Sequence, residues 1–485
     1  MKLPHLILTG VFAMTLVTAS YSASSAENAA MDKFPSAVQK ILKNYKIPEQ
    51  SLSLYIKEID KRQPLITLNA DVPRNPASTI KIITTFAGLE LLGPTYTWQT
   101  NFYLDGTLSD GTLDGNLIMQ GGGDPFLVRE AFWHILFTLQ AKGLKHIQGD
   151  LLIDNGEFED ETGSPADFDN KPYRAYNVFP DAALVNFRVH QFNFVPQKDG
   201  LHIYADPPAS TMKINNKVKL TKGRCRGKHR HIKHDVVTHG HQTLITFTGD
   251  YPRSCGHQNL LRTIMPNDQY VYGVFKSLWE NMGGTITGTV GKTRINGEKL
   301  FYVATSKPLT EIITYINKYS NNVMARQLLL TIGKEKQNHK NKEGKGSKIL
   351  GRQAIHKWLI SIGIPASEFV MDNGSGLSRK SRVSAATMGA LLEHAYHSPY
   401  QPEFMASLPM LGIDGTVRKR LNGAVPAGEI RIKTGLLNDV RAMAGYVHSV
   451  SGKHYVVVAL QNYPGIQNGI GTQVQDEILK WLYQQ

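Results

Sequence analysis

Five segments with a strand pattern lie at the two ends of this 485-residue chain. In each segment the apolar side chains alternate or form a short run, which is typical of strands. The five segments are 51–59, 64–69, 430–434, 442–450 and 455–460. We therefore expect one antiparallel sheet of five strands, to which the beginning and the end of the chain both contribute.

Helices are expected to cover this sheet. Residues 82–92 are apolar nearly all round, which predicts a buried helix. Near the C-terminus, an amphipathic helix is predicted by an apolar face that consists of Val474, Ile478, Leu479 and Leu482. Together these elements predict an α+β domain in two segments, 27–96 and 300–485.

Between the two segments the sequence changes character. From residue 97 to residue 299, turns rich in Gly, Asp and Asn recur, as at Asp105-Gly106 and Asp199-Gly200, with the spacing of about 8–12 residues that is typical of short strands. We expect a large, mainly β insertion here, made of two small nested domains.

The first 26 residues have the three parts of a secretory signal peptide. A basic start at Lys2 is followed by an apolar stretch at 6–17 and by small residues, with cleavage expected near Ala26 or Ala23. A retained membrane anchor is the alternative, but no segment has the roughly 18 consecutive apolar residues of a stable membrane span. A protein outside the cytoplasm does not meet chromosomal DNA, so we expect no nucleic-acid partner despite a formal charge of +14.

The two cysteines, Cys225 and Cys255, lie in the insertion near six histidines. Outside the cytoplasm, two such cysteines can form a disulfide. The histidines leave a metal site as the alternative. We expect the disulfide, because the segment 213–233 is rich in Lys and Arg, which would repel a metal ion.

The pattern Ser-x-x-Lys occurs twice, as Ser78–Lys81 and as Ser210–Lys213. The predicted helix 82–92 follows Lys81, and on a helix residues i and i+3 share a face. After Lys213 the sequence predicts a turn and a strand, in which i and i+3 point to opposite faces. We therefore take Ser78 as the candidate nucleophile and Lys81 as its base; an ordinary helix N-cap is the alternative.

The tripeptide Lys433-Thr434-Gly435 follows a predicted strand. A lysine acts as a base only when its amine is neutral, and both burial and a second cation lower its pKa. Lys433 can supply that cation, and Thr434 offers a hydroxyl to a substrate carboxylate. Gly435 would let a substrate backbone approach the strand closely.

A third motif, Ser320-Asn321-Asn322, lies between two segments of helical periodicity. Ser320 can relay a proton to a leaving group, and Asn322 can hold a substrate amide. The alternative is a plain turn between helices, with Asn321 as the cap.

In this order, Ser-x-x-Lys, Ser-x-Asn and Lys-Thr-Gly form the signature of penicillin-binding proteins and serine β-lactamases. The long insertion after Lys81 makes the chain resemble the low-molecular-mass class C penicillin-binding proteins, D-alanyl-D-alanine carboxypeptidase/endopeptidases similar to penicillin-binding protein 4. Three more stretches, 121–125, 372–379 and 408–416, look like that family. A serine β-lactamase and a catalytically weak peptidoglycan-binding protein are the alternatives.

The resemblance implies a periplasmic enzyme that hydrolyses D-alanyl-D-alanine ends or peptide cross-links of peptidoglycan and is acylated by β-lactam antibiotics. Ser78 would form the acyl-enzyme with Lys81 as base, and Ser320 would relay the proton. The backbone N–H groups of Ser78 and Leu436 would form the oxyanion hole. The substrate-binding residues would be Asn322, Lys433, Thr434 and Gly435. No metal or other cofactor is implied.

Leu436 departs from the family pattern, which usually has Ser or Thr at this position. The lost hydroxyl would weaken binding of a terminal carboxylate by roughly 1.5–3 kcal/mol. A shift toward endopeptidase action or slow turnover is therefore expected, and Leu436→Thr should raise carboxypeptidase activity.

The positive charge is concentrated in two segments, 213–233 and 334–348. We expect both of them to hold the protein near anionic peptidoglycan.

Overall fold

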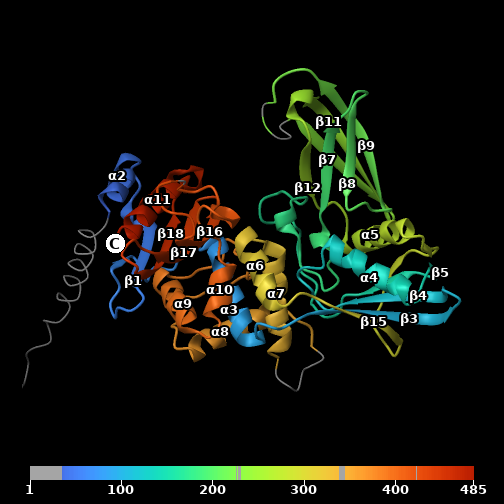
Figure 1. Ribbon diagram of the computed structural model, residues 1–485, viewed down its shortest axis with the longest axis horizontal. Coiled ribbons are helices and arrows are strands. Elements are labelled where there is room, and N and C mark those ends of the chain that lie inside the picture. Colours follow the sequence, from blue (N-terminus) through green and yellow to red (C-terminus); the bar gives the residue numbers. More distant parts are fainter. Residues whose placement is uncertain (1–34, 226, 228–230, 338–343, 422) are drawn as a thin grey trace, which may run out of the picture.

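The computed structural model describes residues 35–225, 227, 231–337, 344–421 and 423–485. The expected signal peptide at 1–26 therefore lies outside the described residues. Both ends of the described chain build one lobe, and its middle builds a second lobe beside it (Figure 1). Within these described ranges, no helix has the length and the apolar character that crossing a membrane requires.

An antiparallel sheet of five strands lies at the centre of the first lobe, in the order β16-β17-β18-β1-β2. Its strands are β1 (Leu52–Glu58), β2 (Ile66–Leu68), β16 (Ile430–Leu437), β17 (Val440–His448) and β18 (His454–Asn462). β1 pairs with β18, so the first strand of the chain lies beside the last (Figure 1). The predicted α+β class, with one sheet built from both chain ends, is confirmed.

Helices cover both faces of this sheet. Two of them pack on one face, namely α2 (Ser36–Asn44) and α11 (Ile470–Tyr483). The helices on the other side are α3 (Lys81–Leu92), α6 (Leu309–Tyr319), α7 (Asn322–Glu335), α8 (Lys348–Ser361), α9 (Ala385–His397) and α10 (Gln401–Ser407). α3 is surrounded by its neighbours, and every residue from Lys81 to Leu89 is buried. The buried helix predicted after Lys81 is therefore confirmed.

The second lobe begins with β3 (Gln99–Ser109) and ends with β15 (Lys299–Thr305), which pairs with β3. The expected boundary at residue 299 coincides with the start of this strand, so we place the end of the insertion after Thr305. A mixed sheet of seven strands forms its base. The other elements of this base are β4 (Thr112–Gly121), β5 (His146–Ile147), β6 (Leu151–Asp154), β13 (Thr285–Ile286), β14 (Val290–Lys292), α4 (Arg129–Ala141) and α5 (Asn267–Asn281).

Two sheets of three strands stand on this base, in the orders β12-β7-β8 and β10-β11-β9 (Figure 1). Their strands are β7 (His190–Pro196), β8 (Leu201–Asp206), β9 (Met212–Thr221), β10 (Ile232–His239), β11 (Gln242–Pro252) and β12 (Gln258–Arg262). Phe192 and Phe247 of these sheets belong to the same apolar core as Leu117 of the base. The insertion therefore has two groups of sheets but one continuous core.

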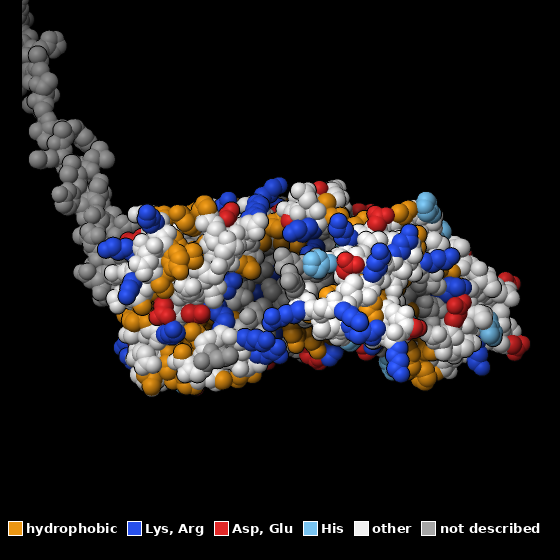
Figure 2. Space-filling view, turned by 90° about the horizontal axis from the view of Figure 1, so that it is seen from above, with side chains coloured by type: hydrophobic (Ala, Val, Ile, Leu, Met, Phe, Trp, Pro, Cys, Tyr) orange, Lys and Arg blue, Asp and Glu red, His pale blue; other side chains and the backbone are white. Residues whose placement is uncertain are grey.

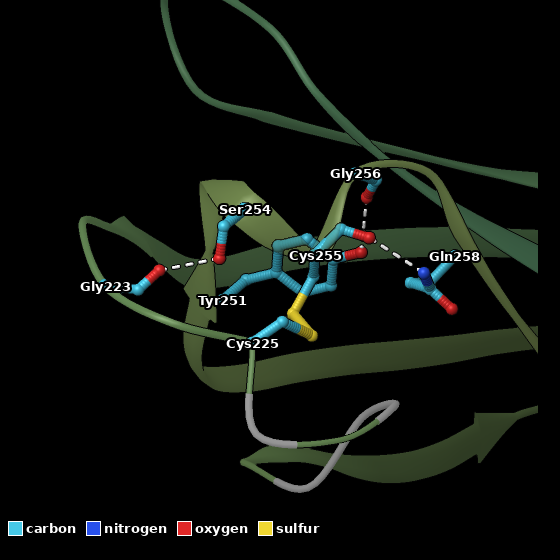
Figure 3. The surroundings of a disulfide bond; sticks show 7 residues. All are labelled: Gly223, Cys225, Tyr251, Ser254, Cys255, Gly256 and Gln258. Atoms are coloured by element: carbon cyan, nitrogen blue, oxygen red, sulfur yellow. Dashed lines mark hydrogen bonds between the residues drawn. A yellow bond between two sulfur atoms is a disulfide. The ribbon is translucent and has the colours of Figure 1, made fainter.

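Cys225 and Cys255 form a disulfide in this lobe, with their Cα atoms 4.9 Å apart (Figure 3). The Tyr251 hydroxyl donates a hydrogen bond to the carbonyl oxygen of Gly256, at 2.7 Å. In the part of the chain that the structure describes, no three His, Cys, Asp or Glu side chains gather as a metal site.

Candidate active site

Ser78 lies in the short 3₁₀ turn η2 (Ala77–Ile80), which leads directly into α3. Three residues later, Lys81 places its Nζ 3.1 Å from Ser78 Oγ. The two side chains therefore share a face at the start of the helix. Lys81 is 0% exposed, whereas Ser78 is half-buried and lines a cavity of about 600 Å³.

Two carbonyl oxygens also bind the Lys81 amine. Its Nζ donates to Asn322 Oδ1 at 2.7 Å and to the backbone carbonyl oxygen of Ser375. Carbonyl oxygens only accept hydrogen bonds. A neutral amine has two hydrogens and one lone pair, so these two acceptors take both hydrogens and leave the lone pair for the Ser78 hydroxyl. This arrangement allows Lys81 to accept the serine proton.

The protonation state of Lys81 follows from its surroundings. Burial holds the pKa of Lys81 well below its ordinary value, and the nearby Lys433 lowers it further. Burial also lowers the pKa of Lys433, to about 7. The lowered pKa of Lys81 favours the neutral amine that a base needs, while Lys433, with a pKa of about 7, keeps part of its charge at neutral pH.

Ser320 and Asn322 lie in the turn between α6 and α7. Ser320 ends α6 in the left-handed conformation, with φ of 56°, and its Oγ accepts a hydrogen bond from Lys433 Nζ at 2.9 Å. Asn321 caps α7 by accepting from the Met324 N–H. The turn therefore has the cap of the structural alternative and also brings Ser320 and Asn322 to the two lysines.

Lys433, Thr434 and Gly435 lie on β16, the edge strand of the five-stranded sheet. Lys433 is fully buried, and Thr434 Oγ1 lies 2.8 Å from Thr416 Oγ1. A Cβ on Gly435 would lie only 2.6 Å from the carbonyl oxygen of Pro76. The backbone that leads into the turn of Ser78 therefore approaches Gly435 closely, and a side chain at this position would clash with it.

The free edge of β16 points toward the cleft. The Ile432 N–H bonds outward to the carbonyl oxygen of Pro409 rather than to β17. In an antiparallel strand, N–H groups point alternately to the two sides. Thr434 and Leu436 therefore present their N–H groups to the same open edge, where Leu436 and Ser78 line one cavity.

Sequence reasoning did not find the contribution of residues 372–379. It assigned this stretch no chemical role, but the carbonyl oxygen of Ser375 accepts a hydrogen bond from the catalytic candidate Lys81. Gly376 has φ of +79°, and a Cβ there would lie 1.9 Å from the carbonyl oxygen of Ala77. Only glycine allows the stretch to run so close to Ser78. Its two glycines around a serine were the available signal.

A segment of the insertion covers the cavity. Phe168 packs on the Arg379 guanidinium at 5.3 Å, and the carbonyl oxygen of Tyr176 accepts from Asn322 Nδ2 at 3.2 Å. The second contact orients the Asn322 amide, so that its oxygen faces Lys81. The insertion thus takes part in building the site, which sequence reasoning did not predict.

The structure places the second Ser-x-x-Lys copy in the insertion, outside the cavity that Ser78 lines. Ser210 lies just before β9 in the insertion, and Lys213 is an exposed residue of that strand. Ser210 is not among the residues that line the cavity of Ser78.

The model of the D-Ala-D-Ala carboxypeptidase 3 (S13) family matches residues 35–485. The chain belongs to this S13 family. A D-alanyl-D-alanine carboxypeptidase of Actinomadura sp. (strain R39) is 26% identical over 469 residues, which are 92% of this chain and 84% of the relative.

Two solved structures have the fold of this S13 chain. Penicillin-binding protein 4 from Haemophilus influenzae has a TM-score of 0.76 at 23% identity, covering 92% of this chain and 99% of its own. A predatory endopeptidase from Bdellovibrio bacteriovorus, acylated by penicillin G, has a TM-score of 0.50 at 15% identity, covering 89% and 90%. The expected resemblance to penicillin-binding protein 4 is confirmed.

Proposed function

We propose that this protein hydrolyses D-alanyl-D-alanine ends and peptide cross-links of peptidoglycan through an acyl-enzyme on Ser78. The observation that carries the proposal is the buried Lys81 amine, which has two carbonyl acceptors for its hydrogens and Ser78 Oγ at 3.1 Å. The S13 membership and the name of the Actinomadura relative give the substrate class.

In the first step, Ser78 Oγ attacks the carbonyl carbon of the penultimate D-alanine while Lys81 takes its proton. The N–H groups of Ser78 and Leu436 stabilise the oxyanion that forms. As the C–N bond breaks, the proton that Lys81 took is passed through Ser320, which is hydrogen-bonded to Lys433 at 2.9 Å, to the leaving nitrogen. Water then attacks the ester and gives a proton to Lys81, which passes it to Ser78 Oγ as the ester bond breaks.

Lys433 and Thr434 bind the carboxylate that follows the scissile bond. Binding of that anion raises the pKa of Lys433 from its value of about 7, so the lysine is charged in the complex. Asn322 and Gly435 belong to the same binding region, and Asn322 additionally orients Lys81.

β-Lactam antibiotics acylate Ser78 by the same attack, as penicillin G has acylated the Bdellovibrio endopeptidase. Slow hydrolysis of this adduct distinguishes the proposed enzyme from a serine β-lactamase. Catalysis itself distinguishes it from a peptidoglycan-binding protein.

The protein acts in the periplasm, where its substrate lies, after removal of the expected signal peptide. Lys and Arg side chains are spread widely over the face drawn in Figure 2, with fewer Asp and Glu side chains between them. Such a surface suits an anionic polymer.

Mass spectrometry of the protein after reaction with benzylpenicillin tests the proposal. The peptide that contains Ser78 should gain the mass of the antibiotic and hold it for minutes, and the untreated enzyme should release D-alanine from a pentapeptide. An adduct on another serine, or rapid turnover of penicillin, would contradict it.

A further inference from the structure

A second cavity, of about 480 Å³, adjoins the catalytic one. Both cavities are lined by Tyr176, Ser320 and Asn322, but Ser78 lines only the first. The second cavity lies between the α6–α7 turn of the first lobe and the insertion. Most of the residues that line it belong to the insertion. A ligand in the catalytic cavity can therefore extend past Ser320 into this space.

The walls of this second cavity suit a peptide. They include a guanidinium and two carboxylates, because Arg129 pairs with Glu130 and with Asp206. They also include two exposed apolar side chains, Tyr319 at 69% and Leu261 at 48%. A peptide presents apolar groups and charges of both signs, whereas one D-alanine would fill little of this space.

The position of Ser320 indicates which part of a substrate reaches the cavity. In the proposed reaction Ser320 passes a proton to the leaving nitrogen, so the leaving group lies on the Ser320 side. Cleavage of a terminal D-alanine releases one residue. Cleavage of a cross-link breaks the same kind of C–N bond but releases a whole second stem peptide, whose amine takes the proton.

We propose that this cavity binds the second stem peptide of a cross-link and thereby supports endopeptidase action. The inference rests on the proposed function, because it concerns the leaving group of that reaction. Residues 186–188 near the cavity all have φ between 45° and 55°, a conformation that is retained where the surrounding structure enforces it.

A bulky residue at the cavity wall tests the inference. Leu261→Trp should lower kcat/KM for a purified cross-linked muropeptide dimer by about fivefold or more, while pentapeptide cleavage and benzylpenicillin acylation stay within twofold. Glu130→Arg, which reverses an exposed charge, should likewise lower kcat/KM for the dimer and leave the reactions with pentapeptide and benzylpenicillin within twofold. Leu300→Trp is the matched control, because Leu300 is a 51% exposed leucine on β15 that does not line the cavity.

Unchanged dimer hydrolysis in both variants, or an equal loss on dimer and pentapeptide, would overturn the inference. If the wild type reacts with neither substrate nor penicillin, the proposed function itself fails.

A separate observation concerns the hydroxyl that Leu436 lacks. Thr416 Oγ1 lies 2.8 Å from Thr434 Oγ1, and Thr416 is exposed. Two hydroxyls have two hydrogens, and their mutual bond uses one of them. The pair therefore keeps one O–H free to donate to a carboxylate.

Thr416 is held firmly in place. It lies in the 3₁₀ turn η7 (Gly415–Val417), which follows Asp414. Asp414 is ion-paired with Lys318, and its Oδ1 accepts from the Met410 N–H at 2.9 Å. The hydroxyl pair is thus preorganised before a substrate arrives.

We infer that Thr416 is a specificity residue, whose hydroxyl replaces the one missing at position 436 in binding the substrate carboxylate. This inference also rests on the proposed function. It differs from the sequence-based expectation, in which the loss at Leu436 remains uncompensated.

Acylation by benzylpenicillin and by its methyl ester tests this inference, because only the acid carries the carboxylate. Thr416→Val should slow acylation by the acid about tenfold, the effect of one hydrogen bond to a charge, and leave the ester within twofold. Thr416→Ser should retain the wild-type rate. Leu436→Thr should restore the Thr416→Val variant but raise the wild type less than threefold.

Thr107→Val is the matched control, since Thr107 is an exposed threonine of β3 in the insertion. Equal loss on acid and ester, no loss at all, or a tenfold gain from Leu436→Thr alone would overturn the role of Thr416. Acylation of the wild type by either compound keeps these outcomes separate from a failure of the proposed function.

Discussion

The chain contains nearly the same six residues twice, Pro-Ala-Ser-Thr-Ile-Lys at 76–81 and Pro-Ala-Ser-Thr-Met-Lys at 208–213. In the first copy the lysine begins α3 and is fully buried beside its serine. In the second copy the serine precedes β9 and the lysine is an exposed residue of that strand. Two residues that are three positions apart lie on the same face of a helix but on opposite faces of a strand. The element, rather than the motif, decides the chemistry.

The largest difference between the copies should appear when each serine is removed. Ser78→Ala should abolish labelling by fluorescent penicillin and lower D-alanine release by about 10⁴-fold or more. Ser210→Ala should label as the wild type does, because Ser210 lies outside the catalytic cavity. Labelling that persists in Ser78→Ala, or that is lost in Ser210→Ala, would reverse the assignment.

Replacing the lysine of each copy should also have different effects on the acylation rate. Lys81→Met removes the proposed base beside Ser78 and should slow acylation by roughly 10²–10⁴-fold. Lys213→Met changes only an exposed side chain and should leave the rate within twofold. Stopped-flow measurement of acylation compares the two variants, and similar rates in both would show that burial of Lys81 has no catalytic consequence.

A pH profile tests the surroundings of the buried copy. Above pH about 7 the free enzyme loses the proton of Lys433 and with it the charge that attracts a carboxylate. The kcat/KM for a pentapeptide should therefore fall by up to about tenfold per pH unit on the alkaline side. Acylation by benzylpenicillin methyl ester should not slow in this way at alkaline pH, because the ester has no carboxylate. Identical pH profiles for acid and ester would show that a group other than Lys433 causes the decrease.

The smallest effect is expected from the exposed copy. Lys213, Lys217 and Lys219 are exposed on β9, and alternate residues of a strand share a face. Replacing all three by Gln should weaken binding to isolated sacculi a few-fold at low salt, where exposed charges are poorly screened. Pentapeptide cleavage is the control and should not change. Sacculus binding that is insensitive to both salt and these substitutions would contradict the proposed contact.

Much of the fold follows from local patterns. The five strands at the chain ends, the buried helix after Lys81 and the interhelical turn at Ser320 were all predicted, because side-chain periodicity reports the element that contains it. The sequence placed the end of the insertion at residue 299, the first residue of β15, because it does not show that β15 pairs with β3, a strand about two hundred residues earlier. The continuous core of the insertion was not predicted either, because it also depends on contacts between residues that are distant in the chain.

The sequence predicted the side chains of the candidate site, but it did not predict which backbone groups contribute to the site. The motif residues carry recognisable functional groups, whereas the carbonyl oxygens of Ser375 and Tyr176 belong to a group that every residue has. Nothing in the identity of a residue tells which carbonyl faces a lysine. For a related reason the sequence did not show that the carbonyl oxygen of Pro76 lies close to Gly435.

The sequence alone determined which element carries each motif, because that depends on neighbours within a few residues. Only the tertiary structure decided that Lys81 has the surroundings that a base needs. Its acceptors, Asn322 and Ser375, lie 241 and 294 residues away in the chain, and the helices that exclude water from it are equally distant. A pKa depends on the groups and the solvent within a few ångströms, and folding brings them together.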